Sequence, residues 1–237
     1  MTDAVFCLPA AGAGATVFRR WQRAAHEADL EVYALATPGR DGDRGRPATS
    51  VAQIVDALAE EVRGRPVASC AVLGHSFGAI LGFELIRRMA ADPGLPFPEL
   101  LVAVGSAAPA RSGGGRKHQL GDEEFVAAVE ALGGMPPGVL DDPDLRELLL
   151  PVLRADFTAA ETYRPEPGAT VPVPVTAVVG DADRTVSRED LDAWSAHTTA
   201  GCRHHVVRGG HFLLDDARDE LLGVVRADLT RARETAR

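Results

Sequence analysis

Short apolar runs alternate with longer amphipathic segments along most of this 237-residue chain. Apolar, β-branched runs bounded by turn residues predict strands, and apolar residues at helical spacing predict helices. We therefore expect strands at 5–8, 32–36, 68–73, 100–104, 175–179 and 205–207. We expect helices at 16–28, 51–63, 77–90, 188–197 and 217–232, with Ser50 and Gln53 forming a capping box before the second of them. Such alternation predicts an α/β fold whose mostly parallel sheet is covered by helices on both faces.

One region, residues 107–170, interrupts the alternation because it has no strand pattern. Its "SGGG" stretch is typical of a flexible connector, and helices are expected at 122–132 and 143–162, with Asp122 and Asp142 as N-caps. The segment is far longer than a crossover needs, which favours a helical lid over two ordinary surface helices. We expect a single domain, 1–237, that contains this lid insertion at 107–170.

The composition is that of a folded globular protein, with 46% hydrophobic and 25% charged residues. A net charge of −9 argues against a nucleic-acid-binding face and against a polybasic membrane contact. The three cysteines form no CxxC pair, and the chain shows neither a signal-peptide pattern nor a run of roughly 20 apolar residues. We expect a cytoplasmic protein without disulfides, and a monomer.

The segment "AVLGHSFGAILGFELIRRMA" at 71–90 carries the strongest chemical signal. Its "GHSFG" fits G-x-S-x-G between an expected strand and an expected helix, which is the context of a nucleophile elbow. The serine of such a turn is strained, and the crowding around it requires glycine two residues away on either side. Ser76 as a plain helix N-cap would not need both glycines. The pattern therefore predicts that Ser76 is a nucleophile.

A serine nucleophile needs a base, and the chain has seven histidines. His211 lies in "RGGHFLLDD" after the last expected strand, at the same carboxyl edge of the sheet as Ser76, whereas His75 is expected only to support the turn. The acid that orients the base is expected in "VTAVVGDADRTV", because the loop "GSAAPA" after 100–104 has no carboxylate. Asp183 has room to reach His211 and Asp181 could instead cap the turn, but the residues alone leave this choice open. The order serine, aspartate, histidine is that of α/β-hydrolases.

The oxyanion hole is expected to pair the backbone N–H of Phe77 with one from the loop after the first strand. That loop, "LPAAGAGATVF", offers Ala11 as the expected donor and Ala10 as the next candidate. A plain Gly-rich turn and a phosphate-binding loop are the alternatives, although no GK[ST] follows.

Several of these segments together resemble the type II thioesterases of polyketide and non-ribosomal peptide assembly lines, over nearly the whole chain. The resemblance lies in "LPAAGAGATVF", "TPGRDGDRGRP", "GHSFGAILGFELIRRM", "GDAD" and "GGHFLL", and above all in "LGGMPPGVLDDPDLRELLLPVLRADFTAAETY" at 132–163. The chain departs from the family pattern with Ala13 at a usual glycine, Phe77 at a usual methionine and one extra residue before Arg44.

The resemblance implies an α/β-hydrolase fold, Asp183 as the acid and His211 as the base. The substrate would be an acyl thioester on the phosphopantetheine arm of an acyl or peptidyl carrier protein, hydrolysed as an editing step without metal or other cofactor. Because carrier proteins are commonly acidic, docking would need a local basic patch, for which Arg111, Arg116 and Lys117 beside the lid are candidates. The alternatives are a product-releasing thioesterase or cyclase, a general esterase or lipase, and a non-catalytic binding module.

Overall fold

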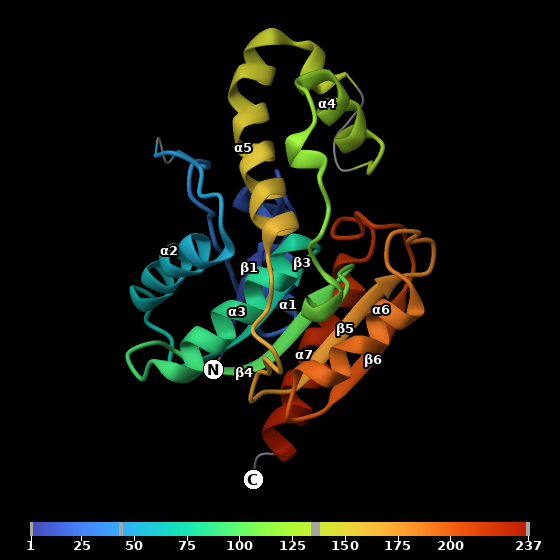
Figure 1. Ribbon diagram of the computed structural model, residues 1–237. Helices are drawn as coiled ribbons and strands as arrows, with labels where there is room; N and C mark the ends of the chain where they lie inside the picture. Colours follow the sequence, from blue (N-terminus) through green and yellow to red (C-terminus); the bar gives the residue numbers. More distant parts are fainter. Residues whose placement is uncertain (1, 43–44, 134–137, 236–237) are drawn as a thin grey trace.

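The sheet forms the centre of the molecule in the computed structural model, which describes residues 2–42, 45–133 and 138–235 (Figure 1). It has six strands in the order β2-β1-β3-β4-β5-β6, and every neighbouring pair is parallel. Each expected strand is present, with somewhat different ends: β1 (Asp3–Leu8), β2 (Leu30–Ala34), β3 (Ser69–His75), β4 (Phe97–Val104), β5 (Val175–Gly180) and β6 (Cys202–Val207). The predicted fold class is confirmed.

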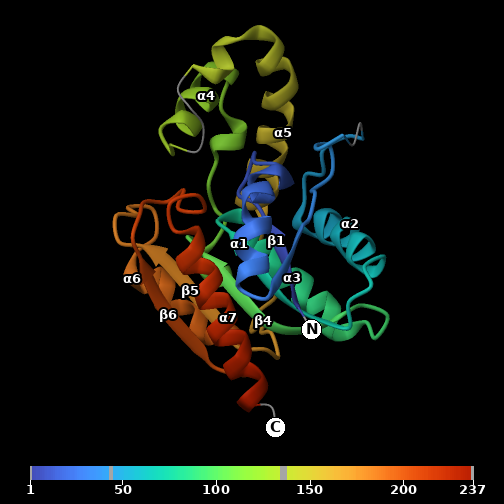
Figure 2. The same cartoon turned by 180° about the vertical axis from the view of Figure 1, so that it is seen from behind.

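Helices cover both faces of the sheet, as the alternation of elements predicts. One face packs against α2 (Val51–Arg63) and α3 (Phe77–Ala91), and Figure 2 shows α1 (Trp21–Glu27) and α7 (Arg218–Thr235) in front of the other. Alternate residues of β1, β3, β4 and β5 enter the two resulting cores, which explains why these inner strands are largely apolar, whereas the edge strand β6 is mostly exposed or half-buried. None of the helices in the described ranges is long and apolar enough to cross a membrane.

Two expected helices contain a 3₁₀ segment. The first is a 3₁₀ helix at Ala15–Arg20 before α1, and the fourth is α6 (Arg188–Asp192) followed by a 3₁₀ helix at Ala193–His197. A 3₁₀ helix places residues i and i+3 directly above one another. Phe18 and Trp21 are related in this way and pack edge to face, as are Trp194 and His197, and all four side chains are buried. In both places a local contact between aromatic rings three residues apart accompanies the 3₁₀ geometry.

Ser50 caps α2 as predicted, because its hydroxyl accepts a hydrogen bond from the Gln53 N–H. The side chain of Gln53 accepts from the N–H of Thr49 rather than of Ser50, so the reciprocal half of the expected capping box is displaced by one residue.

The insertion, residues 107–170, lies between β4 and β5, and no strand occurs in its described part. Its main elements are α4 (Asp122–Glu130) and α5 (Pro143–Thr162), which stand beyond the end of the sheet (Figure 1). Asp142 caps α5 as predicted, through the N–H groups of Asp144 and Leu145. The prediction for Asp122 is wrong: Gly121 occupies the N-cap position, and the Asp122 carboxylate instead pairs with Arg154 at 2.7 Å.

The insertion has a small apolar core of its own, separate from the two sheet cores. Phe125 of α4 is fully buried in it and packs edge to face on Phe157 of α5, with ring centroids 5.4 Å apart. The connection between the two helices includes residues 134–137, which lie outside the described residues, as does Arg44 of the 37–47 segment. The insertion is thus a helical unit with a core of its own, and the C-terminal part of α5 also packs on the first sheet core through Ala159.

Candidate active site

Ser76 occupies a sharp turn between β3 and α3, with φ 54° and ψ −117°. Its N–H donates to the carbonyl of Val104 at 2.8 Å. A Cβ atom on Gly74 would lie 2.1 Å from the carbonyl oxygen of Gly78, and one on Gly78 would lie 2.4 Å from that of Leu8. Both glycines are therefore required by backbone crowding, as predicted. The Ser76 side chain makes no capping hydrogen bond to α3, so the alternative role as an N-cap is contradicted.

The side chains of Ser76, His211 and Asp183 form a continuous hydrogen-bonded chain. His211 Nε2 lies 3.2 Å from Ser76 Oγ, and His211 Nδ1 lies 2.9 Å from Asp183 Oδ2. Because an ionised carboxylate can only accept, the network assigns the proton to Nδ1 and leaves Nε2 to accept from the Ser76 hydroxyl. The three residues come from the ends of β3, β5 and β6, which meet at the carboxyl edge of the sheet as expected.

Thr185 is a member of this network that the sequence analysis missed. Its N–H and its hydroxyl both lie 2.7 Å from Asp183 Oδ1, and its hydroxyl oxygen also lies 2.8 Å from His211 Nδ1. An Asp side chain that accepts a hydrogen bond from the N–H two residues later forms an Asx turn, so the spacing in "DRT" was the available signal. Burial alone would raise the pKa of Asp183, but the hydrogen bonds from His211 and Thr185 outweigh it and lower the pKa to about 2. The carboxylate is thus held ionised beside the imidazole.

Asp181, the alternative acid, has a different position. Its carboxylate accepts a hydrogen bond from the Gly209 N–H at 2.9 Å and so ties the loop after β5 to the loop after β6. The two loops are in close backbone contact, because a Cβ atom on Gly180 would lie 2.3 Å from the Gly209 carbonyl oxygen. The geometry therefore brings Asp183, and not Asp181, to His211.

His75 holds the backbone of His211 through a hydrogen bond. Its side chain is buried, and its Nε2–H donates to the backbone carbonyl of His211 at 2.8 Å. Burial lowers the pKa of His75 to about 4, and the neighbouring His211 ring acts in the same direction. His75 is thus a neutral donor at neutral pH, in the supporting role that the sequence indicates.

The loop after β1 lies next to the N-terminus of α3, because Gly78 packs against the carbonyl groups of Leu8 and Pro9. The Phe77 N–H belongs to the first turn of α3, where N–H groups have no partner within the helix. In the loop, the Ala13 N–H bonds to the carbonyl of Ala10, and Ala11 faces a cavity. The two expected oxyanion donors therefore come from adjacent segments.

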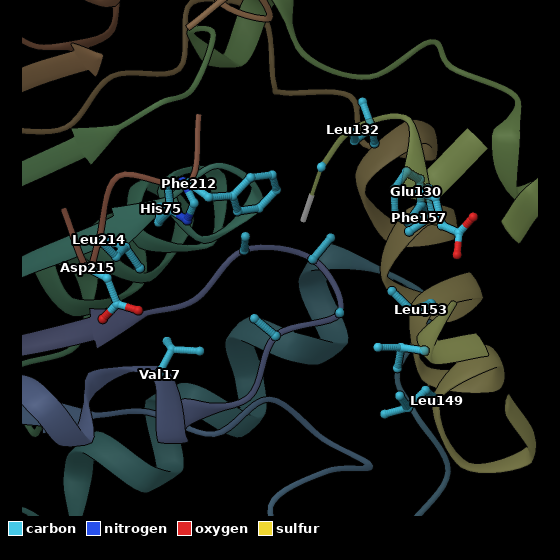
Figure 3. Close-up of a pocket in the computed structure, with 17 residues that line it drawn as sticks. Val17, His75, Glu130, Leu132, Leu149, Leu153, Phe157, Phe212, Leu214 and Asp215 are labelled. Carbon is cyan, nitrogen blue, oxygen red and sulfur yellow. The ribbon is translucent and has the colours of Figure 1, made fainter. Parts of the chain in front are cut away.

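A cavity of about 690 Å³ lies between this loop and the insertion. Figure 3 shows Leu149, Leu153 and Phe157 of α5 on one side of it, opposite His75 and Phe212. Most of its lining is apolar, with Glu130 and Asp215 as the acidic residues. Ser76 and His211 do not themselves line this cavity, but their chain neighbours His75 and Phe212 do, so the cavity lies next to the hydrogen-bonded chain. Such a space suits an apolar acyl group better than a charged one. No group of three or more metal-ligating side chains is found in the described part of the chain.

Comparison with known proteins gives concordant results. A family model described as a thioesterase domain matches residues 3–229. The chain is 33% identical over 220 residues to the gramicidin S biosynthesis protein GrsT of Aneurinibacillus migulanus, which covers 92% of this chain and 85% of that protein. It is 35% identical over 224 residues to the thioesterase PikA5 of Streptomyces venezuelae, which covers 91% and 76% of the respective chains.

Among solved structures, the chain is similar to the type II thioesterase BorB from the borrelidin biosynthetic cluster. The TM-score is 0.83 at 36% sequence identity, and the match covers 97% of this chain and 93% of that one. The similarity therefore extends over the sheet and the insertion together.

Proposed function

The chain belongs to the thioesterase domain family, and we propose that it is an editing, type II thioesterase of polyketide or non-ribosomal peptide synthesis. Its substrate would be an acyl group bound as a thioester to the phosphopantetheine arm of a carrier protein. The hydrogen-bonded chain Ser76–His211–Asp183 beside an apolar cavity is the observation that carries this proposal. The similarity to BorB favours editing over product release, because that protein is described as a type II thioesterase.

The mechanism follows from the arrangement of these groups. Ser76 Oγ attacks the thioester carbonyl carbon while His211 Nε2 takes the hydroxyl proton, and Asp183 stabilises the resulting imidazolium. The N–H groups of Phe77 and Ala11 would stabilise the oxyanion. The C–S bond then breaks, and His211 returns the proton to the leaving thiol. In the second half, His211 activates water, which releases the carboxylic acid and restores Ser76.

The insertion would act as the lid over this reaction. The acyl chain would occupy the cavity between α5 and the loop after β1, and the phosphopantetheine arm would enter beneath the insertion. We propose that the chain acts as a monomer, without metal or other cofactor, and binds neither nucleic acid nor membrane.

Docking of an acidic carrier protein on the basic patch would depend chiefly on Arg116. The Nε of Arg111 pairs with Asp190 at 2.5 Å, and the Nζ of Lys117 lies 3.9 Å from Glu161, so both charges are partly compensated. Arg116 is exposed. This local positive charge would act against the overall charge of −9.

The proposal is tested with a panel of acyl-loaded carrier proteins, acyl-CoA thioesters and simple esters, hydrolysed by wild type and by Ser76→Ala. We expect wild type to prefer carrier-bound short acyl groups and Ser76→Ala to lose a factor of roughly 10⁴ or more in kcat. A fluorophosphonate probe should label wild type only.

Each alternative has a distinct outcome in this experiment. A preference for free esters would indicate a general esterase. A preference for the full-length product chain over short acyl groups would indicate a product-releasing enzyme. Equal labelling of wild type and Ser76→Ala would indicate a binding module without a reactive serine.

A further inference from the structure

The insertion touches the loop that carries the expected oxyanion donor. The Gly12 N–H, which follows Ala11 directly, donates to Oδ2 of Asp156 on α5 at 2.6 Å. Gly12 has φ +78°, and a Cβ atom there would lie 2.2 Å from Cδ2 of Leu153, also on α5. Helix α5 therefore lies directly against the backbone next to Ala11.

Arg40 completes this contact from the loop after β2. Its Nη2 donates to Oδ1 of Asp156 at 2.6 Å, and its Nη1 donates to the carbonyl of Ala13 at 2.9 Å. Both side chains are buried, with 8% of Arg40 and 4% of Asp156 exposed. The pair thus holds the peptide groups of the turn at two points, one just after Ala11 and one at Ala13.

A buried ion pair is a poor way to gain stability, because desolvating both charges offsets most of their attraction. This pair instead fixes the positions of two backbone groups, the Gly12 N–H and the Ala13 carbonyl. The energy of an oxyanion hole depends on donors that are already placed where the negative charge develops. Asp156 and Arg40 come from two segments, 132–163 and 37–47, that contribute neither a triad residue nor an expected oxyanion donor.

We propose that Asp156 and Arg40 are positioning residues that hold the Ala11–Ala13 turn so that the Ala11 N–H faces the oxyanion. The proposal rests on the proposed function, since it takes Ala11 as an oxyanion donor. It has a further consequence: because Asp156 belongs to the insertion, the oxyanion hole is complete only while α5 is seated on the loop. Closure of the lid and activation of the thioester would then be one event.

The test compares Asp156→Ala and Asp156→Asn with wild type in steady-state hydrolysis of an acyl-carrier protein, per mole of serine titrated by a fluorophosphonate. We expect kcat to fall about 10- to 100-fold for Asp156→Ala, because a misplaced donor weakens binding of the transition state. KM should stay within about threefold, because the apolar side chains that line the cavity are unchanged. The kcat of Asp156→Asn should fall less, since the amide oxygen of Asn can still accept from the Gly12 N–H.

Glu161→Gln is the matched control. Glu161 is a buried carboxylate on the same helix that also accepts backbone N–H groups, those of Lys117 and His118, but it does not touch the loop after β1. The Glu161→Gln substitution should lower Tm as Asp156→Asn does and leave kcat within about threefold of wild type. An equal loss of kcat in Glu161→Gln would overturn the proposal, because it would trace the effect to general loosening of the insertion.

The double variant Arg40→Met/Asp156→Leu separates positioning from folding. Replacing a buried ion pair by apolar side chains commonly restores stability. We expect its Tm to recover relative to Asp156→Ala while kcat stays low. Recovery of kcat together with Tm would overturn the proposal. If wild type itself shows no serine-dependent hydrolysis, the proposed function fails as well; if wild type is active and Asp156→Ala keeps its kcat, the positioning role alone fails.

Discussion

The nucleophile and the expected oxyanion donor lie on adjacent segments, but the molecule fixes them by different means. Ser76 is held by backbone contacts at the edge of the sheet: Gly74 and Gly78 leave no space for a side chain, and the Ser76 N–H bonds to the Val104 carbonyl at the end of β4. The turn at Ala11 is held by side chains from distant segments, Asp156 and Arg40. One half of the site, Ser76 with His211 and Asp183, is thus a property of the sheet and is called the sheet half below. The other half, the turn at Ala11, depends on the insertion.

This difference predicts two kinds of response to change. The Ser76–His211–Asp183 half should keep its geometry whatever the position of the insertion, because its loops are joined by backbone contacts at the sheet edge. Substitutions there should act on chemistry or on folding of the whole sheet. Substitutions at the contact between α5 and the loop after β1 should lower kcat while Ser76 itself remains intact.

Asp183→Asn should give the largest effect in the sheet half. An amide at this position can donate a hydrogen bond to Nδ1, which would favour the wrong imidazole tautomer and leave Nε2 without a free lone pair for the Ser76 proton. We expect kcat to fall by about 10⁴, as in the Ser-His-Asp template, with little change in the melting temperature. Stopped-flow or steady-state hydrolysis of an acyl thioester measures this directly.

Asp181→Asn is the control for this substitution, since it lies two residues away in the same loop. Its amide oxygen can still accept from the Gly209 N–H, so kcat should remain within about threefold of wild type. If Asp181→Asn loses as much activity as Asp183→Asn, the two carboxylates are not separated in role and the sheet half is less rigid than its contacts indicate.

Gly78→Ala should give the next largest effect, on folding. The added methyl group would meet the backbone oxygens of Leu8 and Pro9 at 2.4 and 2.5 Å, and neither strand β1 nor α3 can move without disturbing the sheet core. We expect a loss of at least about 4 kcal/mol in the free energy of unfolding, measured by urea denaturation.

Gly82→Ala, one turn later on α3, is its matched control. There the methyl group would meet the side-chain carbons of Val72 and Leu101 at 3.1 and 3.2 Å, which can shift slightly. The gain in helix propensity, about 1 kcal/mol, should offset most of this crowding. A similar loss of stability in both variants would show that helix crowding, and not the elbow, limits position 78.

The sequence predicts the sheet half well because its determinants are local or follow from topology. Every strand, the glycines around Ser76 and the loop of His211 are visible as periodicity, spacing and position after a strand. The choice of Asp183 over Asp181 did not follow from the residues alone. It is decided in the structure by Thr185, which completes an Asx turn and directs the carboxylate towards His211.

The other half could not be predicted from local pattern. The contacts of Asp156 with Gly12 and Arg40 join residues 144 and 116 positions apart, and nothing in the sequence near any of them indicates the pairing. The same holds for Asp122, which was expected to cap a helix and instead pairs with Arg154. In both cases a tertiary contact, and not a local preference, decides where the carboxylate lies.

His75→Gln sharpens the description of the sheet half through its pH dependence. In the folded protein the pKa of His75 is lowered from 6.5 to about 4, chiefly by burial, so protonation favours the unfolded chain. The stability that depends on neutral His75 is complete above pH 6.5 and is lost as the pH falls to 4. The loss should reach about 3 kcal/mol in wild type.

Glutamine keeps a donor for the His211 carbonyl but does not titrate, so His75→Gln should lack this part of the pH dependence. Urea denaturation of both proteins at intervals from pH 4 to 8 measures the difference between their curves, from which titratable groups common to the two proteins cancel. The curves should converge on acidification. Parallel curves would mean that protonation of His75 costs no stability. The backbone of His211 would then be held by the contact between the loops after β5 and β6, and not by the buried imidazole of His75.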